Sequence, residues 1–141
     1  MADRDESARE VWLLMSELVY GNNRRRAVAD ALGMSFGRSR ALRRLARRPM
    51  SMRELADALG IEAPNATVVV DDLEAQGLVR RRAHPTDRRA KVVEATRKGK
   101  ELARRADAIL ATPPPELTAL DPDDLEALRR ILESLRASDR G

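Results

Sequence analysis

The 141-residue chain has no cysteine, a single histidine and only three aromatic residues. The lack of cysteine excludes disulfides, thiol redox sensing, thiolate zinc sites and cysteine nucleophiles. The chain also lacks a run of about twenty apolar residues, and its first residues, MADRDESARE, are charged, unlike a secretion signal. We therefore expect a soluble, cytoplasmic protein that does not enter a membrane.

Signatures of catalysis are missing as well. The sequence contains neither a glycine-rich phosphate loop nor a cluster of metal ligands, and its one histidine, His84, has no obvious nucleophile to activate. A lone imidazole is more typical of a surface residue than of a metal site. We expect no enzymatic activity, no cofactor and no metal.

Charge is abundant and unevenly distributed. Lys and Arg total 27 against 23 Asp and Glu, a net charge of +4 that suits a polyanionic partner. Basic residues cluster within 38–48 and 80–91, whereas the C-terminal part leans acidic. We interpret the first cluster as the solvated face of a helix, which is the usual role of a charge run, with DNA contact as the alternative, and the second as part of a binding site.

The middle of the chain carries the clearest structural signals. Ser51 and Glu54 form the pattern of a capping box, in which each side chain accepts a hydrogen bond from the other residue's backbone N–H. Gly60 and Gly77 suit the left-handed residue that ends a helix, and Pro64 is tolerated in a first helical turn. These signals predict two short helices in succession, as in a helix-turn-helix.

After the second helix the hydrophobic period changes from helical to alternating. Residues 79–84 alternate like a half-exposed strand, Pro85-Thr86-Asp87 supplies turn residues, and 91–94 can return as the partner strand. This pattern predicts a hairpin, or wing, with Arg88 and Arg89 near its tip. We expect Asp87 to order the tip by pairing with an arginine.

Amphipathic helices flank this motif. We predict one long helix across residues 11–33, kinked or frayed at Gly21-Asn22-Asn23, and then a helix from its cap Ser35 to about Arg47. After the wing, the sequence predicts a helix over 97–111 capped by Thr96, and a last helix that begins with Asp121 as cap and Pro122 in the first position.

The expected fold is mainly α with a small β-hairpin wing (α+β). A winged domain closes its core with about 60 to 100 residues, so the remaining terminal helices need a partner, and a symmetric homodimer is the economical solution. We therefore expect residues 1–33 to be an N-terminal dimerisation region, 34–95 a winged helix-turn-helix DNA-binding domain, and 96–141 C-terminal dimerisation helices.

One set of residues extends from the first short helix to the helix after the wing: Leu55-Ala56, Leu59-Gly60, Val70-Asp71, Leu73-Glu74, Gly77-Leu78-Val79, Arg81, Asp87-Arg88-Arg89, Thr96 and Gly99. Together they resemble the MarR family of bacterial transcriptional regulators. The resemblance implies a triangular homodimer that binds a pseudo-palindromic operator, with the second helix of the motif in the major groove and the wing along the minor groove. It also implies repression of a nearby gene and, in many members, release from DNA by a small aromatic or phenolic compound.

Candidate DNA contacts follow from these two elements. Early residues of the second helix meet base edges in a helix-turn-helix, although ordinary helix surface is the alternative for each of them. The two arginines at the wing tip suit a narrow minor groove, and the other basic wing residues suit phosphates. The predicted contacts are Pro64, Asn65, Thr67 and Val68 on the helix, and Arg80, Arg82, Arg88, Arg89 and Lys91 on the wing.

Some positions depart from the family pattern around the second helix. Many relatives have Ser where Glu62 stands and Arg where Val68 stands, and Asp72 adds negative charge near the expected DNA. These changes shift the predicted recognition towards the wing. Together with Asp71 and Glu74, the acids also motivate an alternative, a winged-helix module that binds protein instead of DNA. A ligand-independent architectural DNA binder is a further alternative.

The aromatic residues suggest a candidate effector site. Trp12, Tyr20 and Phe36 lie on the first two predicted helices, with Met34 close by in sequence, and such residues suit a flat apolar ligand. The simpler interpretation is that they fill the core and the dimer interface, because helices bury aromatic residues regardless of ligands.

Overall fold

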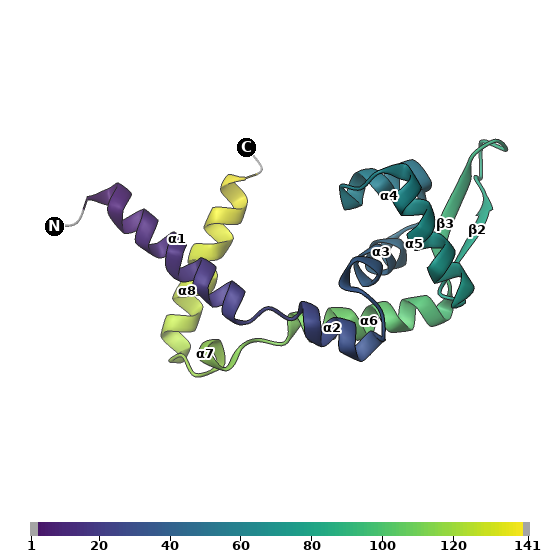
Figure 1. The fold of residues 1–141 in the computed structure, drawn as a ribbon. Helices are drawn as coiled ribbons and strands as arrows, with labels where there is room; N and C mark the ends of the chain where they lie inside the picture. The colour runs from purple at the N-terminus through teal and green to yellow at the C-terminus, as the bar shows by residue number, and fades with distance from the viewer. Residues whose placement is uncertain (1–2, 140–141) are drawn as a thin grey trace. The chain divides into compact units, whose positions relative to one another are not determined.

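The structure, a computed structural model, describes residues 3–139. The chain is mainly helical with one small antiparallel sheet of three strands, which confirms the fold class expected from the sequence (Figure 1). It forms two compact units, Met1–Ala111 and Thr112–Gly141. No helix within the described residues is long and apolar enough to cross a membrane.

The first unit holds the sheet and most of the helices. Its elements are α1 (Arg4–Gly21), α2 (Arg25–Leu32), α3 (Phe36–Arg47), β1 (Met50–Ser51), α4 (Met52–Leu59), α5 (Ala63–Ala75), β2 (Val79–Ala83), β3 (Lys91–Ala95) and α6 (Arg97–Ala111). The second unit holds a short helix and a long one, α7 (Pro115–Thr118) and α8 (Pro122–Ser138).

The prediction of one long helix over residues 11–33 is wrong. Helix α1 begins at Arg4 and ends at Gly21, and α2 starts separately at Arg25. Two asparagine side chains account for the break, because they bind backbone groups that a continuous helix would use. Asn22 donates from Nδ2 to the Leu18 carbonyl at 2.9 Å, and Oδ1 of Asn23 accepts from the Arg25 N–H at 2.9 Å.

The predicted helix caps are confirmed. Ser35 accepts a hydrogen bond from the Arg38 N–H, and Asp121 accepts one from the Asp123 N–H. The capping box is complete, since Ser51 Oγ accepts from the Glu54 N–H at 3.1 Å while the Glu54 carboxylate accepts from the Ser51 N–H at 3.3 Å. These local bonds begin α3, α4 and α8 where the sequence predicted them.

The three strands pair in the order β1-β3-β2. The predicted hairpin is present as β2 and β3, with Arg80 opposite Glu94 and Val79 opposite Ala95. Strand β1 was not expected from the sequence, because a two-residue strand has no periodic pattern. It pairs Met50 with Val93 and so ties the start of α4 to the hairpin.

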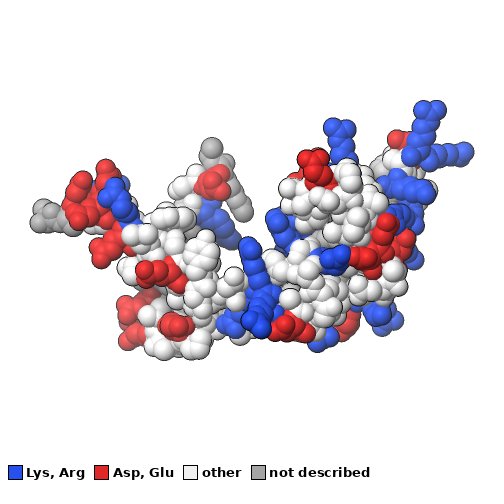
Figure 2. All heavy atoms as spheres, viewed as in Figure 1, with Lys and Arg blue, Asp and Glu red and all other residues white. Residues whose placement is uncertain are grey.

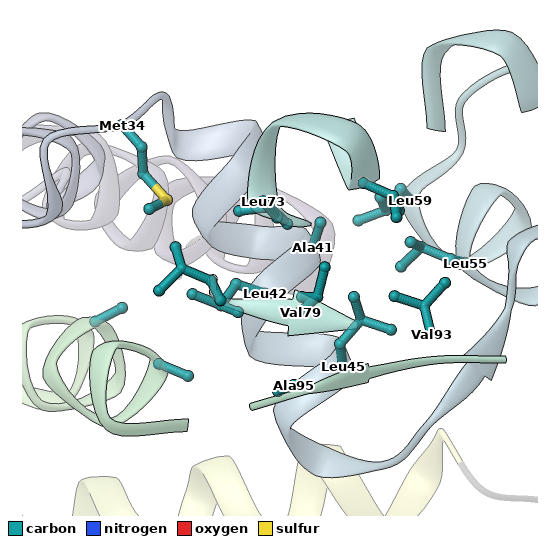
Figure 3. Packing of buried hydrophobic residues seen from close by; sticks show 14 of the residues in the cluster. Met34, Ala41, Leu42, Leu45, Leu55, Leu59, Leu73, Val79, Val93 and Ala95 are labelled. Atoms are coloured by element: carbon teal, nitrogen blue, oxygen red, sulfur yellow. The ribbon is translucent and has the colours of Figure 1, made fainter. Parts of the chain in front are cut away.

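Buried side chains from α3, α4, α5 and the sheet point towards one another and form the core (Figure 3). Leu42, Leu55, Leu73 and Val93 are fully buried. Helix α2 adds Val28 and α6 adds two alanines, so both helices share the core of the winged motif. The division of function at 33/34 and 95/96 stays a prediction.

The start of α6 packs tightly against the turn that follows α5. The Thr96 hydroxyl donates to the Gly77 carbonyl at 2.7 Å, and the Thr96 N–H donates to the Leu78 carbonyl at 3.0 Å. A Cβ at Gly99 would lie 2.0 Å from the same Leu78 carbonyl oxygen, so this position admits only glycine without movement. The contact fixes the hairpin and α5 against α6.

Helices α1 and α8 differ from the rest of the chain. Neither contains a buried residue among those that the structure describes. Large apolar side chains are exposed on both helices, namely Val11, Trp12, Leu13, Leu14, Leu18, Val19 and Tyr20 on α1, and Leu125, Ile131, Leu132 and Leu135 on α8. Each helix therefore presents an apolar surface that its own unit does not cover.

Candidate nucleic-acid interface

The first turns of α5 form an exposed surface. The helix starts at Ala63 with Glu62 as N-cap, and the Glu62 side chain forms no capping hydrogen bond with the first-turn N–H groups. The predicted contact residues Asn65 and Val68 are exposed, as is Pro64. Thr67 is exposed too, although its hydroxyl donates to the Ala63 carbonyl at 3.1 Å. Uncapped N–H groups at a helix N-terminus suit an anionic partner.

Two acids on α5 are bound by one arginine of the hairpin. The Arg81 guanidinium lies 2.6 Å from Asp71 and 2.8 Å from Glu74, and the Arg81 N–H also donates to Glu74. The hydrogen bond to Asp71 is the main cause that raises the pKa of Arg81, followed by the charge of Glu74. The pair of acids thus fixes β2 against α5 and is compensated internally.

Asp72 is compensated from the opposite side of α5. Arg38 of α3 donates from Nε to the Asp72 carboxylate at 2.8 Å and also through a second guanidinium nitrogen. The negative charge that the sequence placed near the expected DNA is therefore held in an ion pair. Of the four acids that motivated a protein-binding alternative, only Glu62 forms no ion pair within the part of the chain that the structure describes.

Arg80 and Arg82 lie on one side of β2 and share one carboxylate. They donate from Nε to the two oxygens of Glu94 on β3, at 2.6 and 2.8 Å. The bond from Arg80, with that from Arg82, lowers the pKa of Glu94 below its usual value. The two arginine side chains remain 69% and 41% exposed, so their other N–H groups are accessible to phosphate.

Hydrogen bonds within the loop order the tip of the hairpin. His84 Nδ1 accepts from the backbone N–H groups of Thr86 and Asp87, both at 3.2 Å. The Asp87 carboxylate accepts from the Arg89 N–H at 3.0 Å. Asp87 therefore does order the tip, but through the backbone of an arginine and not through a guanidinium. The ring nitrogen of His84 thus helps to close the turn.

The side chains of three predicted contact residues at this end of the hairpin form no ion pair with another described residue. Arg88, Arg89 and Lys91 are exposed and form no ion pair with any residue from 3 to 139. Figure 2 shows basic side chains projecting from the hairpin end, whereas acidic and basic side chains lie next to each other over its base. Within the hairpin, the basic side chains without an ion pair are thus concentrated at the tip end.

The structure brings together only part of the candidate effector site. Tyr20 and Phe36 line one hollow of about 420 Å³, where the Arg25 guanidinium lies 5.2 Å from the centre of the Phe36 ring. Trp12 lines a second hollow along α1, which Tyr20 also lines, and Met34 is buried in the core. The ligand role of these four residues stays a prediction.

Sequence reasoning missed the residues that position this surface, Arg38 and Arg81. The two acids three positions apart on α5, Asp71 and Glu74, were a signal, because such residues share one helix face. Their partner lies on another element, and no local pattern identifies it.

Comparison with known proteins agrees with this geometry. A family model described as MarR family matches residues 32–90. The structure of RV1404 from Mycobacterium tuberculosis has a TM-score of 0.74 at 21% identity and covers 99% of this chain and 96% of that one. The transcriptional regulator BldR from Sulfolobus solfataricus has a TM-score of 0.59 at 27% identity, covering 94% and 99%. A point mutant of S. aureus MepR, bound to an oligodeoxyribonucleotide, has a TM-score of 0.64 at 18% identity, covering 94% and 96%.

Proposed function

We propose that the chain is a winged helix-turn-helix transcription regulator of the MarR family, supported by the match of the family model to residues 32–90, and that it is a repressor that binds a pseudo-palindromic operator as a homodimer. Members of this family are regulators of transcription and not enzymes. In this proposal α5 enters the major groove and the hairpin lies along the adjacent minor groove of double-stranded DNA.

The distribution of charge around the hairpin carries the proposal. Arginines at its base are held in ion pairs with Asp71, Glu74 and Glu94, whereas Arg88 and Arg89 at its tip form none with any described residue. Two exposed guanidinium groups on an ordered loop suit a narrow minor groove, where the negative potential is enhanced. The base of the hairpin would position the tip, and the tip would bind the minor groove of the DNA.

On α5 the proposed base contacts are made by side chains of the first two turns. Asn65 can bind adenine through its amide, and Val68 can contact a thymine methyl group. Pro64 and Thr67 complete this exposed surface. In the proposal, Thr67 would contact the phosphate backbone of the DNA. The ion pairs of Asp71 and Asp72 reduce the repulsion that their charges would exert on a nearby phosphate.

Dimerisation is supported by the apolar side chains of α1 and α8. Trp12 and Tyr20 are 66% and 80% exposed, and Leu132 and Leu135 of α8 are 42% and 57% exposed. Helices that leave such surfaces uncovered in one chain are suited to pair with a second copy.

We also propose release from DNA by a small aromatic or phenolic effector in the hollow that contains Tyr20 and Phe36. Its volume of about 420 Å³ lies within the usual range for small-molecule sites. Effector binding there would act next to the break between α1 and α2. Fluorescence quenching of the tyrosine by a panel of aromatic acids tests for binding, and the loss of a DNA complex tests for release.

The hairpin proposal is tested by titrating the full chain against the DNA upstream of its gene. The double variant Arg88→Ala/Arg89→Ala should lower affinity at least tenfold and reduce the slope of log affinity against log salt by about 1.8, since each lost phosphate contact removes about 0.9. Arg26→Ala/Arg130→Ala, a control with equal charge loss at exposed positions elsewhere, should change both quantities little. An unchanged salt slope in the hairpin variant would show that its tip does not contact DNA.

A further inference from the structure

One face of α3 carries four arginines that the proposed function does not use. Arg40, Arg43, Arg44 and Arg47 recur at i, i+3, i+4 and i+7, so they lie along one side of the helix. Helix α3 contains no acidic residue, which distinguishes this face from an ordinary solvated surface of mixed charge. These four residues are called the arginine stripe.

Most of the stripe has no internal compensation. Arg43 donates from Nε to Asp107 of α6 at 2.5 Å. Arg40, Arg44 and Arg47 form no ion pair with any other described residue. Like charges three or four positions apart on a helix repel one another. The stripe is therefore a source of repulsion that a bound polyanion would relieve.

Hollows adjoin the stripe along its length. The four arginines alone line a hollow of about 80 Å³. Since a water molecule occupies roughly 30 Å³ in the liquid, this hollow has room for one oxyanion of phosphate size. Larger hollows share its arginines and continue towards Phe36 on one side and Lys100 on the other. The basic track is thus longer than a single small anion.

The stripe does not face the recognition surface. Arg38 marks the side of α3 that faces α5, because its guanidinium binds Asp72. Arg40 follows two residues later, about 200° around the helix. A duplex bound to α5 and the hairpin would therefore leave the stripe uncovered.

We propose that the arginine stripe is a second binding surface for the phosphate backbone of duplex DNA, through which the operator-bound protein captures a separate DNA segment. The inference rests on the proposed DNA-binding function. Arg40 to Arg47 spans about 10.5 Å of helix axis, which is long enough to reach more than one phosphate of a strand. Guanidinium groups bind phosphate oxygens in bidentate fashion, and a row of them suits a repeating polyanion.

Capture is measured with full-length protein saturating an immobilised fragment of the DNA upstream of the gene, to which a labelled random-sequence duplex is added at low ionic strength. The wild type should retain the second duplex. The variant Arg40→Gln/Arg44→Gln/Arg47→Gln should stay on the fragment but retain about tenfold less of the duplex. The control Arg9→Gln/Arg26→Gln/Arg130→Gln, which equally lowers the net charge from +4 to +1, should behave as the wild type.

Folding is monitored by thermal melting. The stripe variant should melt at the same temperature as the wild type or higher, because it loses repulsion and no ion pair. Capture that persists in a folded stripe variant overturns the proposal. So does a wild type that binds inorganic pyrophosphate but captures no duplex, since that result identifies a small-anion site.

A second arm separates this inference from the function on which it rests. The variant Arg88→Ala/Arg89→Ala should lose preference for the upstream fragment yet keep weak, salt-sensitive binding of the random duplex, measured by fluorescence anisotropy. Adding the three stripe substitutions should weaken that residual binding about tenfold further, with the remainder carried by α5 and the other basic residues of the hairpin. If the residual binding is the same with and without them, the stripe is not a DNA surface. If the residual binding depends on the stripe while no preference for the upstream fragment exists, the stripe proposal holds and operator recognition fails.

Discussion

Elements α2 to α6 with the sheet, here called the winged part, bury most of their large apolar side chains, whereas the terminal helices α1 and α8 leave most of theirs exposed. Leu42, Leu55 and Val70 of the winged part are fully buried, whereas Trp12 of α1 is 66% exposed and Leu132 of α8 is 42% exposed. The winged part therefore completes its core within one chain. The terminal helices leave apolar area in water, which is unfavourable unless another surface covers it. This difference supports the proposed homodimer, in which α1 and α8 would be covered by a second copy of the chain.

The same contrast recurs in the charges of the winged part. Around its base the hairpin satisfies its arginines internally, with Arg81 held by Asp71 and Glu74. At the tip Arg88 and Arg89 are left for a partner, since no residue from 3 to 139 forms an ion pair with them. In the hairpin, the arginine that is paired internally therefore holds in place the strand that leads to the unpaired arginines of the tip.

The largest effect is expected when the exposed apolar surface of α8 is made polar, because the proposed homodimer depends on it. Leu132→Glu/Leu135→Glu should convert a homodimer to monomers, measured by analytical ultracentrifugation, because two charges would be buried without partners. Affinity for the upstream DNA should fall about 1,000-fold, or ~4 kcal/mol, since two linked half-site contacts become independent. The winged core should keep its melting transition.

Ser134→Glu is the matched control, because Ser134 is exposed on α8 and lies about 200° around the helix from Leu132. It should leave the oligomeric state and the DNA affinity unchanged. A double leucine variant that remains dimeric would show that α8 is not part of the interface.

A second prediction tests the winged part on its own. Gly99→Ala places a Cβ 2.0 Å from the Leu78 carbonyl oxygen and 3.1 Å from Leu42 Cδ1, so the start of α6 must move away from the turn after α5. We expect a loss of about 3 kcal/mol, the upper range for overpacking, and a fall in the melting temperature of about 10 °C or more. Thermal denaturation followed by circular dichroism measures both.

The control for this substitution is Gly37→Ala. A Cβ at Gly37, in α3, would meet nothing within 4 Å, so alanine should stabilise the helix by about 0.5–1 kcal/mol. If both variants melt like the wild type, α6 does not need the close contact with Leu78.

Sequence reasoning succeeded where the signal was local. The capping box of Ser51 and Glu54, the Asp121 cap and the hairpin each depend on residues a few positions apart, and all were predicted. The break after Gly21 is also local, since Asn22 and Asn23 cause it, but the apolar stripe on both sides of it predicts a continuous helix. Periodicity reports which face is apolar and does not report whether the backbone continues.

The long-range ion pairs and strand β1 could not be predicted, because their partners are far apart in sequence. Arg38 binds Asp72 across 34 positions, and Arg43 binds Asp107 across 64. Strand β1 exists only because β3 lies beside it. The sequence therefore identified which arginines could bind DNA but not which are already engaged, and this distinction separates the base of the hairpin from its tip.

The smallest predicted effect comes from releasing the ion-paired arginines at the base of the hairpin. Glu94→Gln keeps the shape of the side chain but removes the charge that Arg80 and Arg82 share. Affinity for DNA should rise about threefold, because both guanidinium groups become more available to phosphate. Glu101→Gln, an exposed position on α6, removes the same charge at a distance and serves as the control.

The pH dependence of thermal stability tests whether Glu94 is ion-paired with Arg80 and Arg82 in the folded chain. The pKa of Glu94 is lowered in the folded chain, first by the bond from Arg80 and then by that from Arg82. Its ion pairs therefore stabilise the fold above the unfolded pKa of about 4.3, and this contribution is lost as the pH falls through the lower, folded pKa. The wild type should melt at a higher temperature than Glu94→Gln at neutral pH, and the difference should vanish in acid below that pKa.

A Glu94→Gln variant that binds DNA more weakly than the wild type would mean that Glu94 acts mainly by orienting the two arginines. The base of the hairpin would then take part in binding as much as its tip.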